Sequence, residues 1–126
     1  MGTAKTILIV DDDKSTREVL NAILTKAGFK VILEADVLEL HPFKIVPDII
    51  LLDNNLPDIQ GDSFCAQLKN NPDTKNIPVI LISAMEGLKE KAHLACADDY
   101  INKPFGISLL LGKINALLQK PHEATR

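Results

Sequence analysis

The sequence predicts an α/β domain: a doubly wound, five-stranded parallel sheet with helices on both of its faces. Two observations support this class. Three segments, Ile7–Val10, Ile49–Leu52 and Val79–Ile82, are continuous apolar runs, and continuous rather than alternating apolarity is typical of strands buried on both faces of a parallel sheet. Short apolar segments also alternate along the chain with segments of helical period, which is the order of strand–helix–strand units.

Each expected strand is followed by a segment that favours a helix. The strands are expected at Thr6–Val10, Lys30–Ala35, Asp48–Leu52, Pro78–Ser83 and Asp99–Asn102. Helices are expected within Lys14–Gly28, Gly61–Asn70, Glu86–Cys96 and Gly106–Lys120. A further helix belongs in Asp36–Val46, but Pro42 lies inside that segment. Because proline costs about 3 kcal/mol in a helix interior, we expect only one or two turns there, or an irregular path.

Side-chain spacing predicts how two of these helices begin and which face they bury. In the first helix, one apolar face is formed by Val19, Leu20, Ile23, Leu24 and Ala27. Ser15 and Glu18 have the spacing of a capping box, and Gly28 fits a helix stop. In the helix near Gly61, we expect Asp62 or Ser63 as the N-cap and expect Phe64 and Leu68 to point inward.

Composition excludes several classes of function. The 126 residues fit one domain, and 46% apolar and 25% charged residues are ordinary for a globular protein. The net charge of −3 and the absence of a basic cluster argue against direct nucleic-acid binding. No apolar run approaches the roughly 18 residues of a membrane span, and the start lacks a signal-peptide pattern. Cys65 and Cys96 have no metal-ligand spacing, so we expect reduced thiols in a cytoplasmic protein.

Polar residues stand where the predicted strands end. The first strand runs into Asp11, Asp12 and Asp13, the third ends at Asp53, the fourth at Ser83, and the fifth at Asn102-Lys103-Pro104. Open α/β sheets bind ligands at the carboxyl ends of their strands, which lie at one edge when the sheet is parallel. We therefore expect two or three carboxylates, a hydroxyl and an amine to meet there.

Such a set favours phosphoryl chemistry. Carboxylates that lie close together repel one another and raise each other's pKa, and Mg²⁺ relieves that conflict because it binds one to three carboxylates together with water. Lys103 adds a positive charge, and a cation on each side of a carboxylate suits a phosphoryl group whose developing charge must be offset. A carboxylate can itself act as the nucleophile. Asp53 is therefore the candidate for attack on phosphorus.

Four motifs in order resemble the receiver domain of two-component response regulators. They are ILIVDDD, PDIILLDNNLPDIQG, VILISA and ADDYINKPF, and the resemblance covers about Lys5 to Gln119. It implies the flavodoxin-like strand order 2-1-3-4-5, a bound Mg²⁺ and a phosphoacceptor aspartate. We predict a receiver domain at residues 4–120, followed by a polar tail at residues 121–126.

The resemblance implies a role for each matching residue. Asp53 is the implied phosphoacceptor, and Ser83 and Lys103 are the implied partners of the phosphoryl group. Asp11, Asp12, Asp53 and the backbone carbonyl of Asn55 are the implied Mg²⁺ ligands, whereas Asp13 is expected to cap the first helix. Tyr100 matches an aromatic switch position. The Lys103–Pro104 bond is expected to be cis, and Pro57 and Gly61 match the turn after the phosphoacceptor.

The chain also departs from the family pattern. Cys96 stands where the family usually has glycine, so we expect a change in the turn before the fifth strand. The segment between Ser83 and Lys103 is slightly short, so the helix there is expected to be short or displaced. That helix borders the usual output face of the family.

The resemblance implies a signalling switch rather than an enzyme, although the domain would assist its own phosphorylation and dephosphorylation. The implied partners are a sensor histidine kinase or a histidine phosphotransfer protein, which supplies phosphohistidine, and an unidentified downstream protein. Nucleic acid and membrane are not expected as direct partners. The sequence leaves open whether the chain is a monomer or a phosphorylation-linked dimer, and whether it stands alone or belongs to a larger protein.

Other interpretations have to be weighed. Asp11 to Asp13 alone would fit a charge cluster at a helix N-terminus, and Tyr100 alone would be a half-buried strand residue. A pseudo-receiver that is never phosphorylated is the main alternative, against which stands the complete set of acidic pair, Asp53, Ser83 and Lys103. A small Mg²⁺-dependent phosphatase would want a second aspartate where this chain has Asn55.

Overall fold

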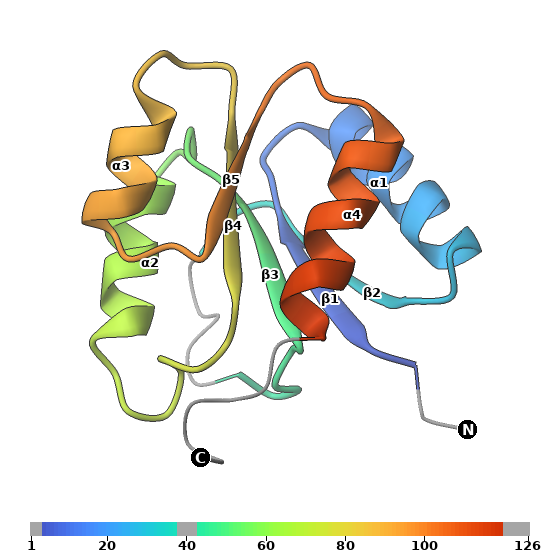
Figure 1. Cartoon of the computed structure of the whole chain (residues 1–126), viewed down its shortest axis with the longest axis horizontal. Coiled ribbons are helices and arrows are strands. Elements are labelled where there is room, and N and C mark those ends of the chain that lie inside the picture. The colour runs from blue at the N-terminus through green and yellow to red at the C-terminus, as the bar shows by residue number, and fades with distance from the viewer. Residues whose placement is uncertain (1–3, 38–42, 120–126) are drawn as a thin grey trace.

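The computed structural model of the chain describes residues 4–37 and 43–119. These residues form three layers, with a central sheet between two pairs of helices (Figure 1). The strands are β1 (Thr6–Val10), β2 (Lys30–Glu34), β3 (Ile49–Asp53), β4 (Val79–Ser83) and β5 (Asp99–Asn102). All neighbouring strands are parallel, in the order β2-β1-β3-β4-β5. The predicted fold class and strand order are confirmed.

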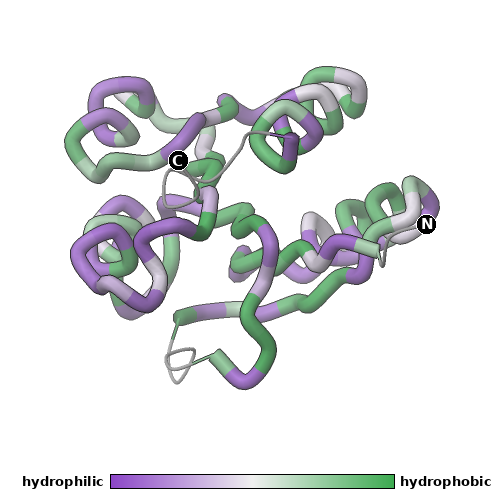
Figure 2. Tube along the Cα trace, turned by 60° about the horizontal axis from the view of Figure 1, so that its bottom comes forward, coloured by the Kyte–Doolittle hydropathy of each residue, from purple (hydrophilic) through white to green (hydrophobic). Residues whose placement is uncertain are grey.

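Two helices cover each face of the sheet. They are α1 (Lys14–Lys26), α2 (Gly61–Lys69), α3 (Leu88–Leu94) and α4 (Ile107–Leu118). In Figure 1, α1 and α4 lie on one side of the sheet, and α2 and α3 lie on the other. Figure 2 shows that the helices carry both hydrophilic and hydrophobic residues, as expected of helices with one face on a core.

The two-residue period of a strand divides the core into two parts. On β1, Ile7 and Ile9 pack on the side of α1 and α4, whereas Leu8 and Val10 pack on the side of α2 and α3. Every residue of the central strands β3 and β4 is buried. This double burial explains why the two strands read as continuous apolar runs.

Helix ends and faces differ in part from expectation. Residue Val19 is 57% exposed although it was predicted on the inward face of α1, where Leu20 and Leu24 are buried. The apolar stripe of α1 is therefore narrower than its sequence suggests. The Ser15–Glu18 capping box is also wrong, because α1 begins earlier, at Lys14, with Asp13 as its N-cap.

The start of α2 also corrects a prediction. The helix begins at Gly61 with Gln60 in the N-cap position, so neither Asp62 nor Ser63 caps it. Gln60 makes no side-chain capping bond, and the N–H groups of Gly61 and Asp62 donate instead to Asn54, the residue after β3. Phe64 and Leu68 of α2 are buried, as predicted.

The segment Asp36–Val46 was expected to hold a short or irregular second helix. Pro42 and the rest of residues 38–42 lie outside the described residues, and residues 43–48 form no helix. Helix α3 is the helix that was predicted to be short, and its seven residues confirm that expectation. The polar tail at residues 121–126 lies outside the described residues.

A residue with a left-handed backbone ends α3. Cys96 has φ 61°, and two bonds close the helix end: the Cys96 N–H donates to the His93 carbonyl at 3.2 Å, and the Ala97 N–H donates to the Ala92 carbonyl at 2.9 Å. This is a Schellman motif, which usually places glycine where Cys96 stands. The turn therefore keeps a glycine geometry despite the side chain, contrary to the expected change. The Lys103–Pro104 bond is cis, as expected.

Replacing this cysteine tests the cost of its backbone conformation. Cys96→Gly is expected to raise the free energy of unfolding by about 1 kcal/mol, because a residue with a Cβ pays roughly that for a left-handed backbone. Urea unfolding measures the change. Cys96→Ser keeps the Cβ and removes the thiol, so its stability should match that of the wild type. Equal stabilities of Cys96→Gly and Cys96→Ser would contradict the argument.

Candidate functional site

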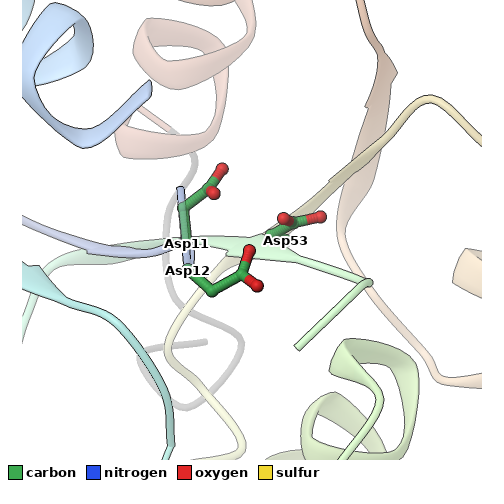
Figure 3. Close-up of side chains that lie close together, drawn as sticks. All are labelled: Asp11, Asp12 and Asp53. Atoms are coloured by element: carbon green, nitrogen blue, oxygen red, sulfur yellow. The ribbon is translucent and has the colours of Figure 1, made fainter. Parts of the chain in front are cut away.

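Three acidic side chains meet at the carboxyl edge of the sheet (Figure 3). Asp11 and Asp12 directly follow β1, and Asp53 is the last residue of β3, the neighbouring strand. One carboxylate oxygen from each residue lies within 4.8 Å of the other two. The predicted gathering of carboxylates at this edge is confirmed.

Asp53 is the carboxylate of this cluster whose pKa is raised by its surroundings. Its side chain is buried at the end of a strand that is itself buried throughout. Burial raises the pKa of the Asp53 carboxyl above its usual value of 3.8, and the negative charges of Asp11 and Asp12 act in the same direction. The Asn55 N–H, which donates to Asp53 Oδ1 at 3.1 Å, and the charge of Lys103 offset only part of this pKa increase.

Lys103 brings a positive charge to the cluster. It follows β5, the strand at the far edge of the sheet, and its side chain reaches back across β4. The Nζ atom lies 3.1 Å from Asp11 Oδ2 and 3.7 Å from Asp53 Oδ2. The Lys103 ammonium thus pairs with two of the three clustered carboxylates, and the cluster keeps an excess of negative charge that a further cation would balance.

Asp11 is fixed by the first turn of α1. Its Oδ1 accepts from the Asp13 N–H at 2.9 Å, and its carbonyl accepts from Arg17 Nη1 at 2.7 Å. Asp13 itself accepts from both the N–H and the hydroxyl of Thr16, and these bonds lower the pKa of the Asp13 carboxyl. Asp13 therefore caps α1 as predicted, whereas Asp11 turns toward the site.

Ser83 ends β4, between the strands that carry Asp53 and Lys103. It is fully buried and pairs with Asn102 across the sheet. Its Oγ accepts from the Met85 N–H at 3.2 Å and lies 3.4 Å from Asn55 Nδ2. Through Asn55, the Ser83 hydroxyl is thus linked to Asp53.

Tyr100 lies on β5 opposite Leu81 and is half-buried against the core under α2 and α3. Lys113 Nζ of α4 lies 5.6 Å from the centre of its ring, within the range of a cation–π contact. The same ammonium is 2.9 Å from Asp99 Oδ1. These contacts place Tyr100 beside Lys113 of α4 rather than in the acidic cluster, and its switch role stays a prediction.

The donor set suits a hard divalent cation. Carboxylate oxygens are preferred by Mg²⁺, which binds through one or two carboxylates and keeps several waters. Asp12 is exposed while Asp11 and Asp53 are buried, so an ion held here could keep water on its open side. The oxygen atoms of Asp11, Asp12 and Asp53 lie close enough together to share one ion.

The family model named "Response regulator receiver domain" matches residues 7–115 of the sequence. The chain belongs to the response regulator receiver family. The receiver fold explains why the acidic pair, Asp53, Ser83 and Lys103 converge, since each follows or ends one strand of the same parallel sheet.

Individual receiver proteins support this membership. Protein PilG of Pseudomonas aeruginosa is 34% identical in a match 119 positions long that covers 87% of this chain and 84% of that protein. The DNA-binding dual master transcriptional regulator RpaA of a Synechocystis strain is 32% identical over 90% of this chain. The chain spans about half the length of RpaA and of several other curated relatives (49% to 54%).

Two solved receiver structures share the fold closely. The chemotaxis response regulator CheY4 of Vibrio cholerae has a TM-score of 0.83 and 26% identity, covering 91% of this chain and 99% of that chain. The receiver domain of the sensor histidine kinase PA1611 from Pseudomonas aeruginosa has a TM-score of 0.84 and 26% identity, covering 93% of this chain and 99% of that chain. Its structure has a magnesium ion coordinated in the active-site cleft.

Among the described helices of the present chain, none is long and apolar enough to cross a membrane.

Sequence reasoning missed two residues that shape the receiver site. Arg17 binds the Asp11 carbonyl from the first turn of α1. Asn54, the residue after Asp53, is wholly buried with every polar side-chain atom bonded. A polar residue directly after a buried strand was the available signal for Asn54. Arg17 gave none, because an exposed helix position also suits arginine.

The buried carboxylate of this receiver domain predicts a pH dependence. A raised pKa in the folded state means that ionising Asp53 costs folding stability, a cost that is absent below the unfolded-state pKa and fully present above the folded-state value. With a chelator present, the contribution of Asp53 to the free energy of unfolding should therefore fall as pH rises from about 4 toward neutrality, whereas the contribution of Asp13, whose pKa is lowered, has the opposite sign. Asp53→Asn should remove part of that fall and be more stable than the wild type at pH 7.

The matched control is Asp58→Asn, which neutralises an exposed carboxylate on the same loop. Urea unfolding at several pH values measures all three proteins. If Asp53→Asn were no more stable than Asp58→Asn at pH 7, the burial argument would be wrong.

Proposed function

We propose that this receiver domain is a phosphorylation-activated switch that takes a phosphoryl group from a phosphohistidine onto Asp53, with Mg²⁺ bound. The observation that carries the proposal is the position of Asp53. Its carboxylate is buried at the end of β3, within 4.8 Å of two further carboxylates and 3.7 Å from the Lys103 ammonium. The family match and the magnesium ion in a neighbouring receiver structure support the same reading.

The proposed reaction is an in-line transfer. An Asp53 oxygen forms a bond to phosphorus as the bond between phosphorus and the histidine nitrogen breaks, and that nitrogen keeps the electron pair. The product is an acyl phosphate, which water later hydrolyses. Bound Mg²⁺ supplies positive charge for the transferring oxygens, with Asp11, Asp12, Asp53 and the Asn55 carbonyl as its proposed ligands. Lys103 neutralises the other side, and the Ser83 hydroxyl is the proposed donor to a phosphoryl oxygen.

Phosphorylation is proposed to act by shifting a balance between two conformations. In the structure, the Ser83 hydroxyl is turned to Met85 and Asn55, so a new bond to phosphate would redirect it. Tyr100 lies on the strand next to Ser83 and is held by Lys113 of α4. A change at Ser83 can therefore reach the surface formed by α3, β5 and α4, where a downstream protein would bind.

An apolar groove beside the site suits a helix of the phosphodonor protein. It has a volume of about 640 Å³ and lies between α1 and α4, lined in part by Val19, Ile23, Phe105 and Ile107. The lining of the groove also includes Lys103 and Ala84, so the groove borders the acidic site. Val19 and Ile107 are 57% and 50% exposed. A sensor kinase or phosphotransfer protein that packs on this groove would bring its phosphohistidine to Asp53, and the cytoplasm is the proposed place of that encounter.

A pseudo-receiver that only binds other proteins is the second candidate. It requires that the acidic cluster and Lys103 persist without a chemical role. The burial of Asp53, which destabilises the apo domain, disfavours that reading.

Intact mass tests the chemistry directly. Incubation with acetyl phosphate and Mg²⁺ should add one phosphoryl group to the wild-type chain, since the donor needs no protein contact. Asp53→Asn and excess chelator should both abolish the adduct, whereas Asp58→Asn should be labelled like the wild type. An adduct that survives in Asp53→Asn would place the chemistry elsewhere, and no adduct on the wild type would favour the pseudo-receiver.

The groove predicts that a substitution in it slows phosphoryl transfer from a protein donor more than labelling by a small-molecule donor. Val19→Glu should slow transfer from a phosphohistidine protein about tenfold relative to labelling by acetyl phosphate, since loss of a buried apolar anchor costs more than about 1 kcal/mol. Leu94→Glu is the control, because Leu94 is 80% exposed on α3, away from the groove. Rapid-quench measurement of both reactions gives the ratio. An equal slowing by both donors, or by Leu94→Glu, would contradict the assignment.

A further inference from the structure

Asn54 is a buried polar residue at the carboxyl edge of the sheet. It follows the buried strand β3 directly, its side chain is fully buried, and its backbone N–H continues the sheet by donating to the Ile82 carbonyl at 3.0 Å. A buried amide costs folding free energy unless all of its hydrogen-bonding atoms are satisfied. Here both side-chain atoms have partners, which lie on two different segments of the chain.

The oxygen atoms of Asn54 close the start of α2. Its Oδ1 accepts from the Asp62 N–H at 2.7 Å, and its backbone carbonyl accepts from the Gly61 N–H at 2.9 Å. These are the first two N–H groups of the helix, which have no partner within it. Gln60 stands in the N-cap position but makes no capping bond with its side chain. Asn54 therefore caps α2 from its position directly after β3.

Gly61 makes this arrangement possible. A Cβ at Gly61 would collide with the Asp53 carbonyl and come within 2.8 Å of the Asn54 Cα. The backbone of the helix start thus lies directly against the strand end that carries the phosphoacceptor, and any residue with a side chain would force the two apart.

The Asn54 amide nitrogen reaches the loop after β4. Its Nδ2 lies 3.0 Å from Met85 Sδ and 3.2 Å from Gln60 Oε1. The Met85 N–H in turn donates to the Ser83 hydroxyl, and Asn55 Nδ2 lies 3.4 Å from that same hydroxyl. Asn54 is therefore joined to Ser83 on two sides, through Met85 in space and through Asn55 along the chain.

We propose that Asn54 is a positioning residue, which holds the Asp53–Asn55 backbone and the Ser83–Met85 loop in register for phosphoryl transfer. The inference rests on the proposed function, because it assigns Asn54 a role at the Asp53 site. Asn54 does not touch the reacting group. It acts through Asn55, whose N–H binds Asp53 Oδ1, and through Met85, whose N–H orients the Ser83 hydroxyl.

A purely structural role would be limited to capping α2, and the two roles can be separated. Asn54→Leu removes the capping oxygen and the contact to Met85 together. Adding Gln60→Ser to that variant supplies a side-chain cap at the N-cap position, where serine is strongly preferred. The cap is then restored while the contact to Met85 stays absent.

The experiment measures urea unfolding and the rate of labelling by acetyl phosphate, well below the unfolding temperature, for the wild type, Gln60→Ser, Asn54→Leu and the double variant. We expect Asn54→Leu to lose stability and to be labelled at least fivefold more slowly. The double variant should regain most of the stability but not the rate. Recovery of both in the double variant would overturn the proposal, because Asn54 would then be a helix cap alone.

A readout without phosphorylation keeps the proposal testable if the wild type is not labelled. The chain has two methionines, so the methyl resonance of Met85 is simple to assign by NMR with Met85→Leu as reference. The resonance should shift more in Asn54→Leu and in the double variant than in Gln60→Ser, which removes only the Gln60 Oε1 partner of the Asn54 amide and keeps the contact to Met85. An unmoved Met85 resonance would overturn the proposed link, whereas a shifted resonance in an unlabelled protein would contradict the proposed function and retain the link.

Discussion

The carboxylates of Asp11, Asp12 and Asp53 cluster at the edge of the sheet, where the Lys103 ammonium pairs with two of them. This excess of negative charge is the constraint on which the rest of the structure depends. Asp53 and Asp11 are buried, and among residues 4–37 and 43–119 Lys103 is the one whose ammonium lies within 4.0 Å of both carboxylates. Burial and like charges raise the pKa of Asp53, so the apo domain carries an electrostatic cost that a second cation reduces. A dianionic phosphoryl group alone would worsen the imbalance, which explains why the proposed transfer needs Mg²⁺ as well as Lys103.

The sheet supplies the geometry that this constraint requires. Parallel strands end at the same edge, so β1, β3, β4 and β5 each deliver one part of the site from segments far apart in the sequence. The buried apolar residues of β1, β3 and β4 lie directly beneath the site. Loops after the strands then fix individual atoms: the first turn of α1 holds Asp11, and Asn54 ties the start of α2 to the strand end beside Asp53.

Much of this arrangement could be predicted from the sequence because its signals are local. The runs before Asp11 and Asp53 identify buried parallel strands, and the rule that ligands bind at the carboxyl ends brings the acidic residues and Lys103 together. The missed features depend on contacts between distant segments. Asp62 was expected to cap α2, but the cap comes from Asn54, eight residues earlier. Val19 likewise lines an open groove together with Phe105 and Ile107, and helical period alone does not predict such a neighbourhood.

Fluorine NMR with beryllofluoride tests the acceptor site most directly. This tetrahedral mimic of a phosphoryl group must bind an Asp53 oxygen, a divalent cation and the Lys103 ammonium at the same time. With Mg²⁺ present, protein-bound fluoride resonances should appear in the wild type and disappear in Asp53→Asn and on chelation. Shifts in backbone amide signals should reach Asn55, Ser83 and Tyr100 in the same sample. Absence of any bound fluoride resonance in the folded wild-type protein would contradict the assignment of Asp53 as a phosphoacceptor.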